Sequence, residues 1–385
     1  MSDDRLKTQS LTIDRLRPLL ALMVVGLHVR PYFISGTASF LDGPYEASVI
    51  LIFRILFSVA VPFFFLISGL YFFKGLDEWD SSVWKSKIRK RVGSILVPYL
   101  LWNFIALLCY PLTRLAGHLV NGAAFPDIIT QINERGLLRL FWNRSLYGSF
   151  NNEVTTLFGW TSATGAPMDA PTWFLRDLMV VILFTPLIWW LIRHLNKSFI
   201  LLAGILYVVD LWIPVSGFSS TAFFLFSLGA WLSLTGRDLV LVSEKKPKLQ
   251  LAISLLTMII AAISCGRNAW IYTISSRLFI IFAIPTLFHM VSVTPDCEKR
   301  KKLFNGLVKS SFFIYLIHTI LITDAVCWIF DVALHPGNKT VLFILLALST
   351  LTIYTICHLI WLFMDRFTPR LLKILTGNRS LDRKQ

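Results

Sequence analysis

Long apolar segments separated by short polar connections run through nearly the whole chain. Each long segment is close to the roughly 20 residues that an α-helix needs to cross about 30 Å of hydrocarbon. A soluble domain does not contain so many runs of this length, so the pattern predicts an all-α membrane bundle of about ten transmembrane helices. The predicted spans are residues 12–29, 48–73, 93–115, 172–192, 198–215, 219–235, 250–265, 270–291, 309–328 and 341–364.

The distribution of positive charge predicts the orientation of these spans. Apolar residues make up 55% of the chain and charged residues 15%, which is unlike a soluble globular protein. The net charge of +15 would suit a nucleic-acid partner, but most of the 37 Lys and Arg fall in segments that are inner if the N-terminus is inside. Positive residues stay on the cytoplasmic side during insertion. Both termini, including the basic tail 365–385, are therefore predicted in the cytoplasm, with lipid and no nucleic acid as partner.

The chain is predicted to be one membrane domain, residues 1–385, with a single long outer loop at 117–171. The loop is rich in aromatic residues, among them Trp142 and Trp160, and part of it (127–142) is expected to form an amphipathic helix on the membrane surface. The five cysteines have no paired spacing, so neither a disulfide framework nor a metal site is predicted. The first apolar run lacks a cleavage site and is expected to be a retained helix.

Ionisable residues inside predicted spans are costly and are candidates for function. Counting residues from the span ends places five of them, on four helices, in one layer of the outer half of the bilayer. They are His28, Arg54, Arg176, Asp177 and Arg277. The alternative interpretation is a structural Arg–Asp pair together with arginines that extend toward the interface.

The first predicted helix carries Arg17 and His28 eleven residues apart. Eleven residues return an α-helix to within about 20° of the same face with a rise of about 16 Å. That rise matches the reach of a pantetheine arm, so phosphates bound at Arg17, a bidentate phosphate ligand, would place a thioester near His28. A hydrogen-bonded structural histidine and a basic residue that only sets the topology are the alternatives.

Two further groups of residues are candidates for holding a phosphorylated donor. The basic run at 85–91 precedes a span and is predicted to seat the phosphates of coenzyme A, or to act only as a cytoplasmic anchor. The segment SSFFIYLIH presents three polar residues on one helix face, which a polar seam between helices also explains. The candidate cofactor-binding residues are Arg17, Lys87, Arg89, Lys90, Arg91, Ser311, Tyr315 and His318.

At these residues the chain resembles the acyltransferase type 3 family of bacterial membrane acyltransferases. Arg17 and His28 fit the family's pattern of a basic residue, ten others and a histidine in the first helix. Four later blocks follow in order, and the match is close to the shorter members that O-acetylate surface polysaccharides. The blocks are VPFFFLISGLYFF at 61–73, KIRKRVGSILVPYLLW at 87–102, PTWFLRDLMV at 171–180 and SSFFIYLIH at 310–318. The third-helix block has four basic residues, and the resemblance does not distinguish which of them contact phosphate.

The resemblance implies an acyl-CoA donor, most often acetyl-CoA, that enters from the cytoplasm. It also implies a hydroxyl acceptor on a glycan or lipid-linked sugar, and a location in the bacterial cytoplasmic membrane. His28 is expected to be the essential base or a transient acyl carrier, since an imidazole with an ordinary pKa of about 6.5 accepts a proton near neutrality. Arg176 and Asp177 are the other catalytic candidates. The candidate substrate-binding residues are Arg54, Arg277, Trp142, Trp160 and Trp173.

Two other classes of membrane protein compete with an acyltransferase. A secondary transporter or flippase for a glycan-related solute also has about ten helices and intramembrane charges. It does not account for Arg17, His28 and the basic start of the third helix together, and the sequence shows no Gly/Pro-broken helix pairs in matching halves. A non-enzymatic sensor or assembly protein is the second alternative. The sequence makes no prediction of the oligomeric state.

Overall fold

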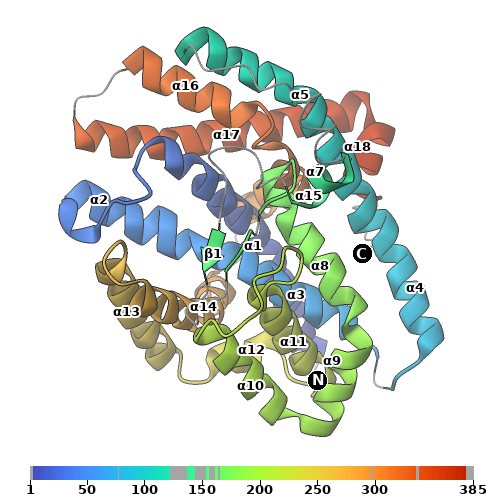
Figure 1. Cartoon of the computed structure of the whole chain (residues 1–385). Coiled ribbons are helices and arrows are strands. Elements are labelled where there is room, and N and C mark those ends of the chain that lie inside the picture. Colours follow the sequence, from blue (N-terminus) through green and yellow to red (C-terminus); the bar gives the residue numbers. More distant parts are fainter. Residues whose placement is uncertain are drawn as a thin grey trace.

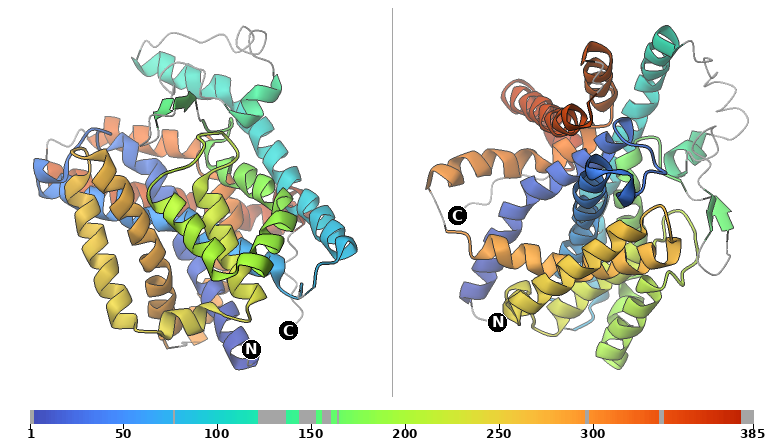
Figure 2. Two further views of the ribbon diagram at one scale, coloured as in Figure 1. Left: turned by 60° about the horizontal axis from the view of Figure 1, so that its bottom comes forward. Right: turned by 90° about the vertical axis from the view of Figure 1, so that its left-hand side faces the viewer.

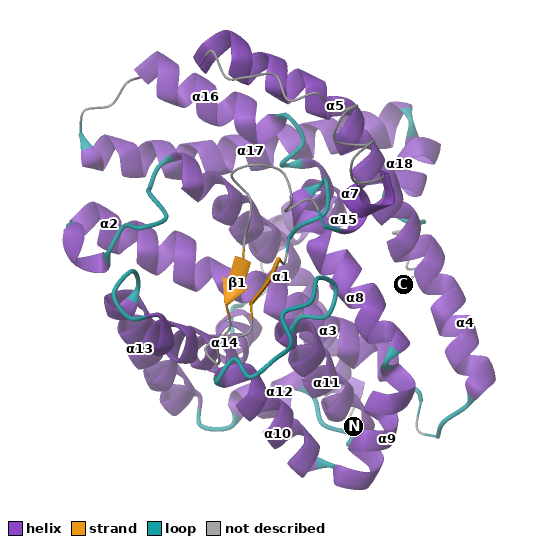
Figure 3. Cartoon of the chain, in the orientation of Figure 1, coloured by secondary structure: helices purple, strands orange, loops and turns teal. Residues whose placement is uncertain are grey.

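The computed structural model describes residues 3–378 apart from 77, 122–136, 144–152, 156–160, 164, 296–297 and 335–337. Within these residues the chain is a bundle of helices, and its two strands are three residues long each (Figures 1 and 3). This confirms the predicted all-α class.

Most of the helices follow one another with short connections. The first part of the chain forms α1 (Asp3–Val29), α2 (Pro44–Val49), α3 (Ala60–Phe73), α4 (Ser81–Arg91), α5 (Val97–Asn121) and α7 (Leu137–Trp142). The middle part forms α8 (Trp173–Leu183), α9 (Thr185–Leu195), α10 (Lys197–Val208), α11 (Ser220–Leu234), α12 (Leu239–Glu244), α13 (Pro247–Ser264) and α14 (Ala269–Ser292). The last part forms α15 (Glu298–Ile317), α16 (Ile322–Leu334), α17 (Lys339–Phe367) and α18 (Pro369–Leu375). The two strands lie in the longer segment between α7 and α8.

Short turns of other helix types join several of these elements. A π-helical turn, η3 (Ile50–Leu56), and a 3₁₀ turn, η4 (Phe57–Val59), make α2 and α3 one continuous helical segment. A second π-helical turn, η5 (Val92–Leu96), joins α4 to α5, and a 3₁₀ turn, η7 (Ala170–Thr172), leads into α8. The first π-helical turn contains Arg54, one of the predicted substrate-binding residues.

The described residues contain five helical segments that are long and apolar enough to cross a membrane. They are Pro44–Phe73, Ser81–Leu112, Pro247–Ser264, Ala269–Ser292 and Lys339–Phe367. The number rises to as many as seven if each of two bent helix pairs counts as one span, while α10 and α11 are apolar but shorter. The chain is thus a multi-span membrane protein, and the predicted number of ten is not confirmed. The cytoplasmic location of both termini stays a prediction.

Two predicted spans are not single straight helices. The span predicted at 172–192 breaks at Phe184, where α8 and α9 are bent by 60°. The span predicted at 309–328 breaks after Ile317, and α15 and α16 are bent by 85°. At the first break Pro186 lies in the first turn of α9, where its missing N–H is not needed. Each of these two predicted spans is therefore a bent pair of helices in the structure.

The helices α3 and α11 pack against each other with almost no side-chain layer between them. A Cβ atom added at Gly69 would lie 2.0 Å from the carbonyl oxygen of Phe226, and one added at Gly229 would lie 2.0 Å from that of Leu66. Small residues at such crossings allow backbones inside a membrane to approach closely. These two glycines therefore set the spacing of the helices on which α8 and the candidate site are built.

We expect Gly229→Ala to destabilise the protein by about 3 kcal/mol, because the added methyl group overlaps a backbone that cannot move away cheaply. Gly306→Ala is the matched control, since a Cβ there meets only His358 at 3.9 Å. Thermal unfolding of both variants in detergent, followed by size-exclusion chromatography, measures the difference. Equal midpoints would show that α3 and α11 are not held at this distance.

The segment predicted as a long outer loop contains regular structure. Helix α5 continues to Asn121, and β1 (Glu153–Thr155) pairs antiparallel with β2 (Thr161–Ala163). The amphipathic helix predicted at 127–142 is described only over Leu137–Trp142, which is helical, and residues 127–136 lie outside the described residues. Helix α7 and the strands lie at the end of the bundle opposite the start of α1 (Figure 2).

Candidate active site

His28 lies near the end of α1, where its side chain meets a second histidine. Its Nδ1 atom is 2.9 Å from the carbonyl oxygen of Val24, one turn earlier in the helix. The Nε2 atom of His318 is 3.2 Å from the same Nδ1 atom, and the two rings are 4.9 Å apart at an angle of 68°. The structure thus brings the predicted catalytic histidine into contact with a residue that was predicted to bind the donor.

His318 lies at the 85° break between α15 and α16 and is fully buried. Its Nδ1 atom is 3.1 Å from the carbonyl oxygen of Ile314 and 3.0 Å from that of Tyr315. Its own carbonyl oxygen accepts hydrogen bonds from the backbone N–H and the hydroxyl of Thr323. Both the ring and the backbone of His318 are therefore held in place.

A buried polar network next to the break was not predicted. The hydroxyl of Thr319 donates to Asp169 at 2.9 Å, and the backbone N–H of Asp169 donates to Asn103 at 2.9 Å. The Asn103 amide donates in turn to Thr172 at 2.9 Å. Asn103 is fully buried and Asp169 is 2% exposed. A polar amide within the apolar run at 93–115 was the signal in the sequence that could have revealed this network.

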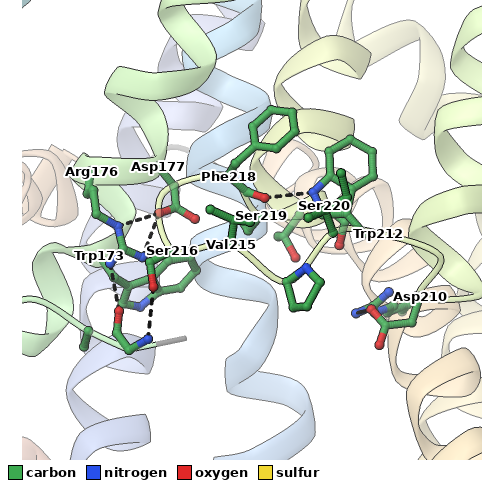
Figure 4. Close-up of a pocket in the computed structure, with 16 residues that line it drawn as sticks. Trp173, Arg176, Asp177, Asp210, Trp212, Val215, Ser216, Phe218, Ser219 and Ser220 are labelled. Carbon is green, nitrogen blue, oxygen red and sulfur yellow. Dashed lines mark hydrogen bonds and ion pairs between the residues drawn. The ribbon is translucent and has the colours of Figure 1, made fainter. Parts of the chain in front are cut away.

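A pocket of about 350 Å³ opens between α8, α14 and the connection from α10 to α11 (Figure 4). Its volume is within the range of ligand sites. Charged, hydroxyl and aromatic side chains line it together. The lining residues are Gly165, Ala166, Trp173, Arg176, Asp177, Asp210, Trp212, Ile213, Pro214, Val215, Ser216, Phe218, Ser219, Ser220, Thr221 and Arg277.

Arg176 and Asp177 form an ion pair at one side of the pocket (Figure 4). The Nε and Nη2 atoms of Arg176 are each 3.0 Å from one carboxylate oxygen of Asp177, and both side chains are at most 5% exposed. The Nη1 atom of Arg176 donates to the carbonyl oxygens of Trp142 at 2.6 Å and Gly165 at 2.8 Å. Because every donor atom of the guanidinium has an acceptor, the buried charge is tolerated.

A second ion pair at the other side of the pocket joins Arg277 of α14 to Asp210. Arg277 also donates to the carbonyl oxygen of Tyr207, and its guanidinium lies 5.0 Å from the centre of the Tyr207 ring. Asp210, whose φ is 58°, follows α10 and was not singled out in the sequence. Both arginines that line the pocket are therefore neutralised by aspartates.

Comparison of the whole sequence with known protein families shows to which family the chain belongs. The acyltransferase domain family matches residues 11–362, which include both histidines and both ion pairs. The chain belongs to this acyltransferase family. The resemblance stated from the sequence motifs is confirmed.

A curated relative of this acyltransferase is the succinoglycan biosynthesis protein ExoH of Rhizobium meliloti (strain 1021). The two are 28% identical over 195 residues. The matched region is 49% of this chain and 44% of ExoH, so the chain spans less than half the length of the relative. No solved structure matches the acyltransferase.

The remaining predicted substrate-binding residues lie in different places. Trp173 lines the pocket. Trp142 is 41% exposed. Its indole N–H donates to the carbonyl oxygen of Ser216 at 3.1 Å, which fixes the ring beside the connection from α10 to α11. Arg54 does not line the pocket, since its guanidinium donates to the carbonyl of Gly36 and lies 5.4 Å from the Tyr272 ring centre. Trp160 lies outside the described residues.

The predicted phosphate-binding residues lie on α1 and α4. Arg17 forms an ion pair of 2.8 Å with Asp14, and both side chains are about one-third exposed. Lys87 donates to the carbonyl oxygens of Phe72 and Lys74, so it caps the end of α3. Arg91 is half-buried. Arg89 and Lys90 of the same helix are exposed.

Ser311 and Tyr315 of the acyltransferase contribute to packing in the described structure. The hydroxyl of Ser311 donates to the carbonyl oxygen of Leu307 at 2.6 Å, within its own helix. The hydroxyl of Tyr315 donates to the carbonyl oxygen of Pro171, and its ring meets Phe174 edge-on at 5.9 Å. Tyr315 therefore ties α15 to the turn that precedes α8.

We expect Asp177→Ala to destabilise the acyltransferase by about 3–5 kcal/mol, because the substitution leaves the charge of Arg176 buried without its partner. Asp14→Ala is the control, since it breaks a partly exposed pair whose removal costs about 0–1 kcal/mol. Thermal midpoints of the two variants in detergent measure the contrast. A small loss in Asp177→Ala would mean that water reaches Arg176.

Proposed function

We propose that the protein transfers an acetyl group from acetyl-CoA to a hydroxyl of a glycan or lipid-linked sugar at the bacterial cytoplasmic membrane. The family supports acyl transfer, and the relative named for succinoglycan biosynthesis supports a polysaccharide acceptor. The observation that carries the proposal is the orientation of His28. A carbonyl oxygen only accepts hydrogen bonds, so the contact with Val24 requires the proton of a neutral His28 to be on Nδ1. Its Nε2 atom then has a lone pair for chemistry.

In the proposed reaction, Nε2 of His28 takes the proton of the acceptor hydroxyl while the hydroxyl oxygen bonds to the thioester carbon. The carbon–sulfur bond then breaks, and the imidazolium returns the proton to the sulfur, which gives the ester and CoA thiol. In the alternative route, Nε2 attacks the thioester first and carries the acyl group, and the hydroxyl proton again ends on the sulfur. Both routes need an unprotonated Nε2.

We place the donor along α1, with its phosphates on the cytoplasmic side. Arg17 and His28 lie on one continuous helix, so the rise between them is about 16 Å. The exposed Arg89 and Lys90 on α4 are suited to phosphate oxygens, because their side chains are not buried within the bundle. Lys87 is a weaker candidate, since it already binds two carbonyl groups at the end of α3.

We place the acceptor in the pocket beside Arg176 and Arg277. Each arginine is paired with an aspartate, so the pocket presents fixed hydrogen-bonding groups without a net charge from these pairs. The indole rings of Trp173 and Trp212 also line it. Paired charges and apolar ring faces suit a neutral sugar unit, which has hydroxyl groups on its edge and C–H groups on its faces.

One structural feature is shared with the alternative of a transporter. Transporters often bind their substrates where helices are broken, and the described part of this chain has two bent helix pairs. The family match favours the enzyme. Release of CoA thiol on addition of acceptor separates the two, because a transporter moves its solute without cleaving a thioester.

We expect His28→Ala to abolish acetyl transfer, with a loss of at least about 1,000-fold, because no other group in the proposed reaction supplies Nε2. His194→Ala is the matched control, since His194 makes the same contact from Nδ1 to the carbonyl of Trp190 at 2.8 Å but is exposed. Purified variants are assayed with labelled acetyl-CoA and lipid-linked oligosaccharides extracted from the native membranes. A fully active, folded His28→Ala protein would disprove the assignment.

We expect Trp173→Ala to raise the KM for the acceptor about tenfold and to leave the KM for acetyl-CoA unchanged, because one aromatic face of the pocket is lost. Trp190→Ala is the control, since Trp190 is 51% exposed and does not line the pocket. Initial rates measured while each substrate is varied separate the two constants. A change confined to the donor KM would place the acceptor elsewhere.

A further inference from the structure

The contact between His28 and His318 also determines which nitrogen atoms of the two rings carry protons. The Nδ1 atom of His318 faces the carbonyl oxygens of Ile314 and Tyr315, so this atom must carry a proton. A protonated Nε2 on the same ring would make His318 a fully buried cation, and it would point a second N–H at the Nδ1 proton of His28. His318 is therefore neutral, with a lone pair on Nε2.

The hydrogen bond between the rings then has one direction. The Nδ1–H group of His28 donates to Nε2 of His318 at 3.2 Å and shares its proton with the carbonyl oxygen of Val24 at 2.9 Å. Among the described residues none makes a hydrogen bond with Nε2 of His28. The two acceptors, the Val24 carbonyl oxygen and Nε2 of His318, fix the plane of the His28 ring. The Val24 carbonyl alone would leave the ring freer to rotate.

We propose that His318 is a positioning residue that orients His28 and stabilises the imidazolium formed when Nε2 takes the proton of the acceptor hydroxyl. This inference rests on the proposed function. When Nε2 gains that proton, the positive charge is shared by both nitrogens and the Nδ1–H group becomes a stronger donor. The lone pair of His318 is already aimed at it, so no group has to reorganise during the step.

The break between α15 and α16 explains how a side chain from another helix can be held so rigidly. Tyr315 donates to Pro171 on one side of His318, and Thr319 donates to Asp169 on the other. Thr323 binds the carbonyl of His318 itself. The backbone N–H of His318 still donates to the carbonyl oxygen of Ile314 at 3.2 Å, as in a helix, but the carbonyl of His318 bonds to Thr323 and not to residue 322, so the regular pattern of α15 ends at His318.

In this proposal, His318 has the role of the carboxylate in a serine protease triad, because it accepts a hydrogen bond from the Nδ1–H group of the catalytic histidine. The acceptor here is neutral, whereas the carboxylate is charged. A carboxylate at this place would be a buried charge in the bundle and would need further partners. An imidazole accepts the hydrogen bond at a lower desolvation cost. It therefore suits a site that lies within a membrane-spanning bundle.

The test compares three variants of the full-length protein in the acetyl-transfer assay. His318→Phe keeps a ring but removes the acceptor, and we expect kcat to fall roughly 10- to 100-fold while both KM values change by less than about twofold. His318→Gln can place its amide oxygen near the position of Nε2, and we expect kcat within about fivefold of the wild type. His358→Phe is the control, since His358 bonds to Ser310 at 2.9 Å in the same bundle, and we expect an unchanged kcat.

Each result bears on the inference. Rescue by Gln of a loss seen in Phe, with equal thermal midpoints, supports a hydrogen-bond acceptor at residue 318. Full activity of His318→Phe, or equal losses in the Phe and Gln variants at wild-type stability, overturns the positioning role while the proposed function stands. A wild-type protein that releases no CoA thiol on addition of the oligosaccharides overturns the proposed function and this inference with it.

Discussion

Arg176 is buried in the bundle only because each donor atom of its guanidinium has an acceptor. Two of these acceptors are carbonyl oxygens from the end of α7 and from the segment before α8, and the third is the carboxylate of Asp177. A polar group without a partner in hydrocarbon costs several kcal/mol, so this requirement holds distant parts of the chain together. Arg176 thereby holds the end of α7 beside Gly165, which lines the pocket.

The sequence predicted the bundle and several of its polar positions, for a physical reason. Apolar runs of membrane length have few other uses, and an ionisable residue inside one must be paired. The spacing of Arg17 and His28 depends only on one continuous helix, and α1 is such a helix over Asp3–Val29. These inferences depend only on residues that are close together in the sequence.

The break after Ile317 and the partners of the polar residues could not be predicted, because they depend on contacts between distant segments. Residues 318–322 contain no glycine or proline, yet the chain bends there by 85°, with Leu321 at a φ of 63°. The bend is held by Thr319 and Tyr315, which bind Asp169 and Pro171 some 150 residues earlier. Asp210 likewise gains its role only when α14 brings Arg277 beside it.

The segment from Gly165 to Trp173 links the pocket to the histidine pair. One end lines the pocket through Gly165, Ala166 and Trp173. Its middle binds α15 and the break beyond it, through Pro171 and Asp169. A sugar bound against Trp173 would press on the same short segment that holds His318 in place. The lining of the pocket and the histidine pair are thus connected through a few hydrogen bonds, and this connection depends on the helix break that the sequence did not reveal.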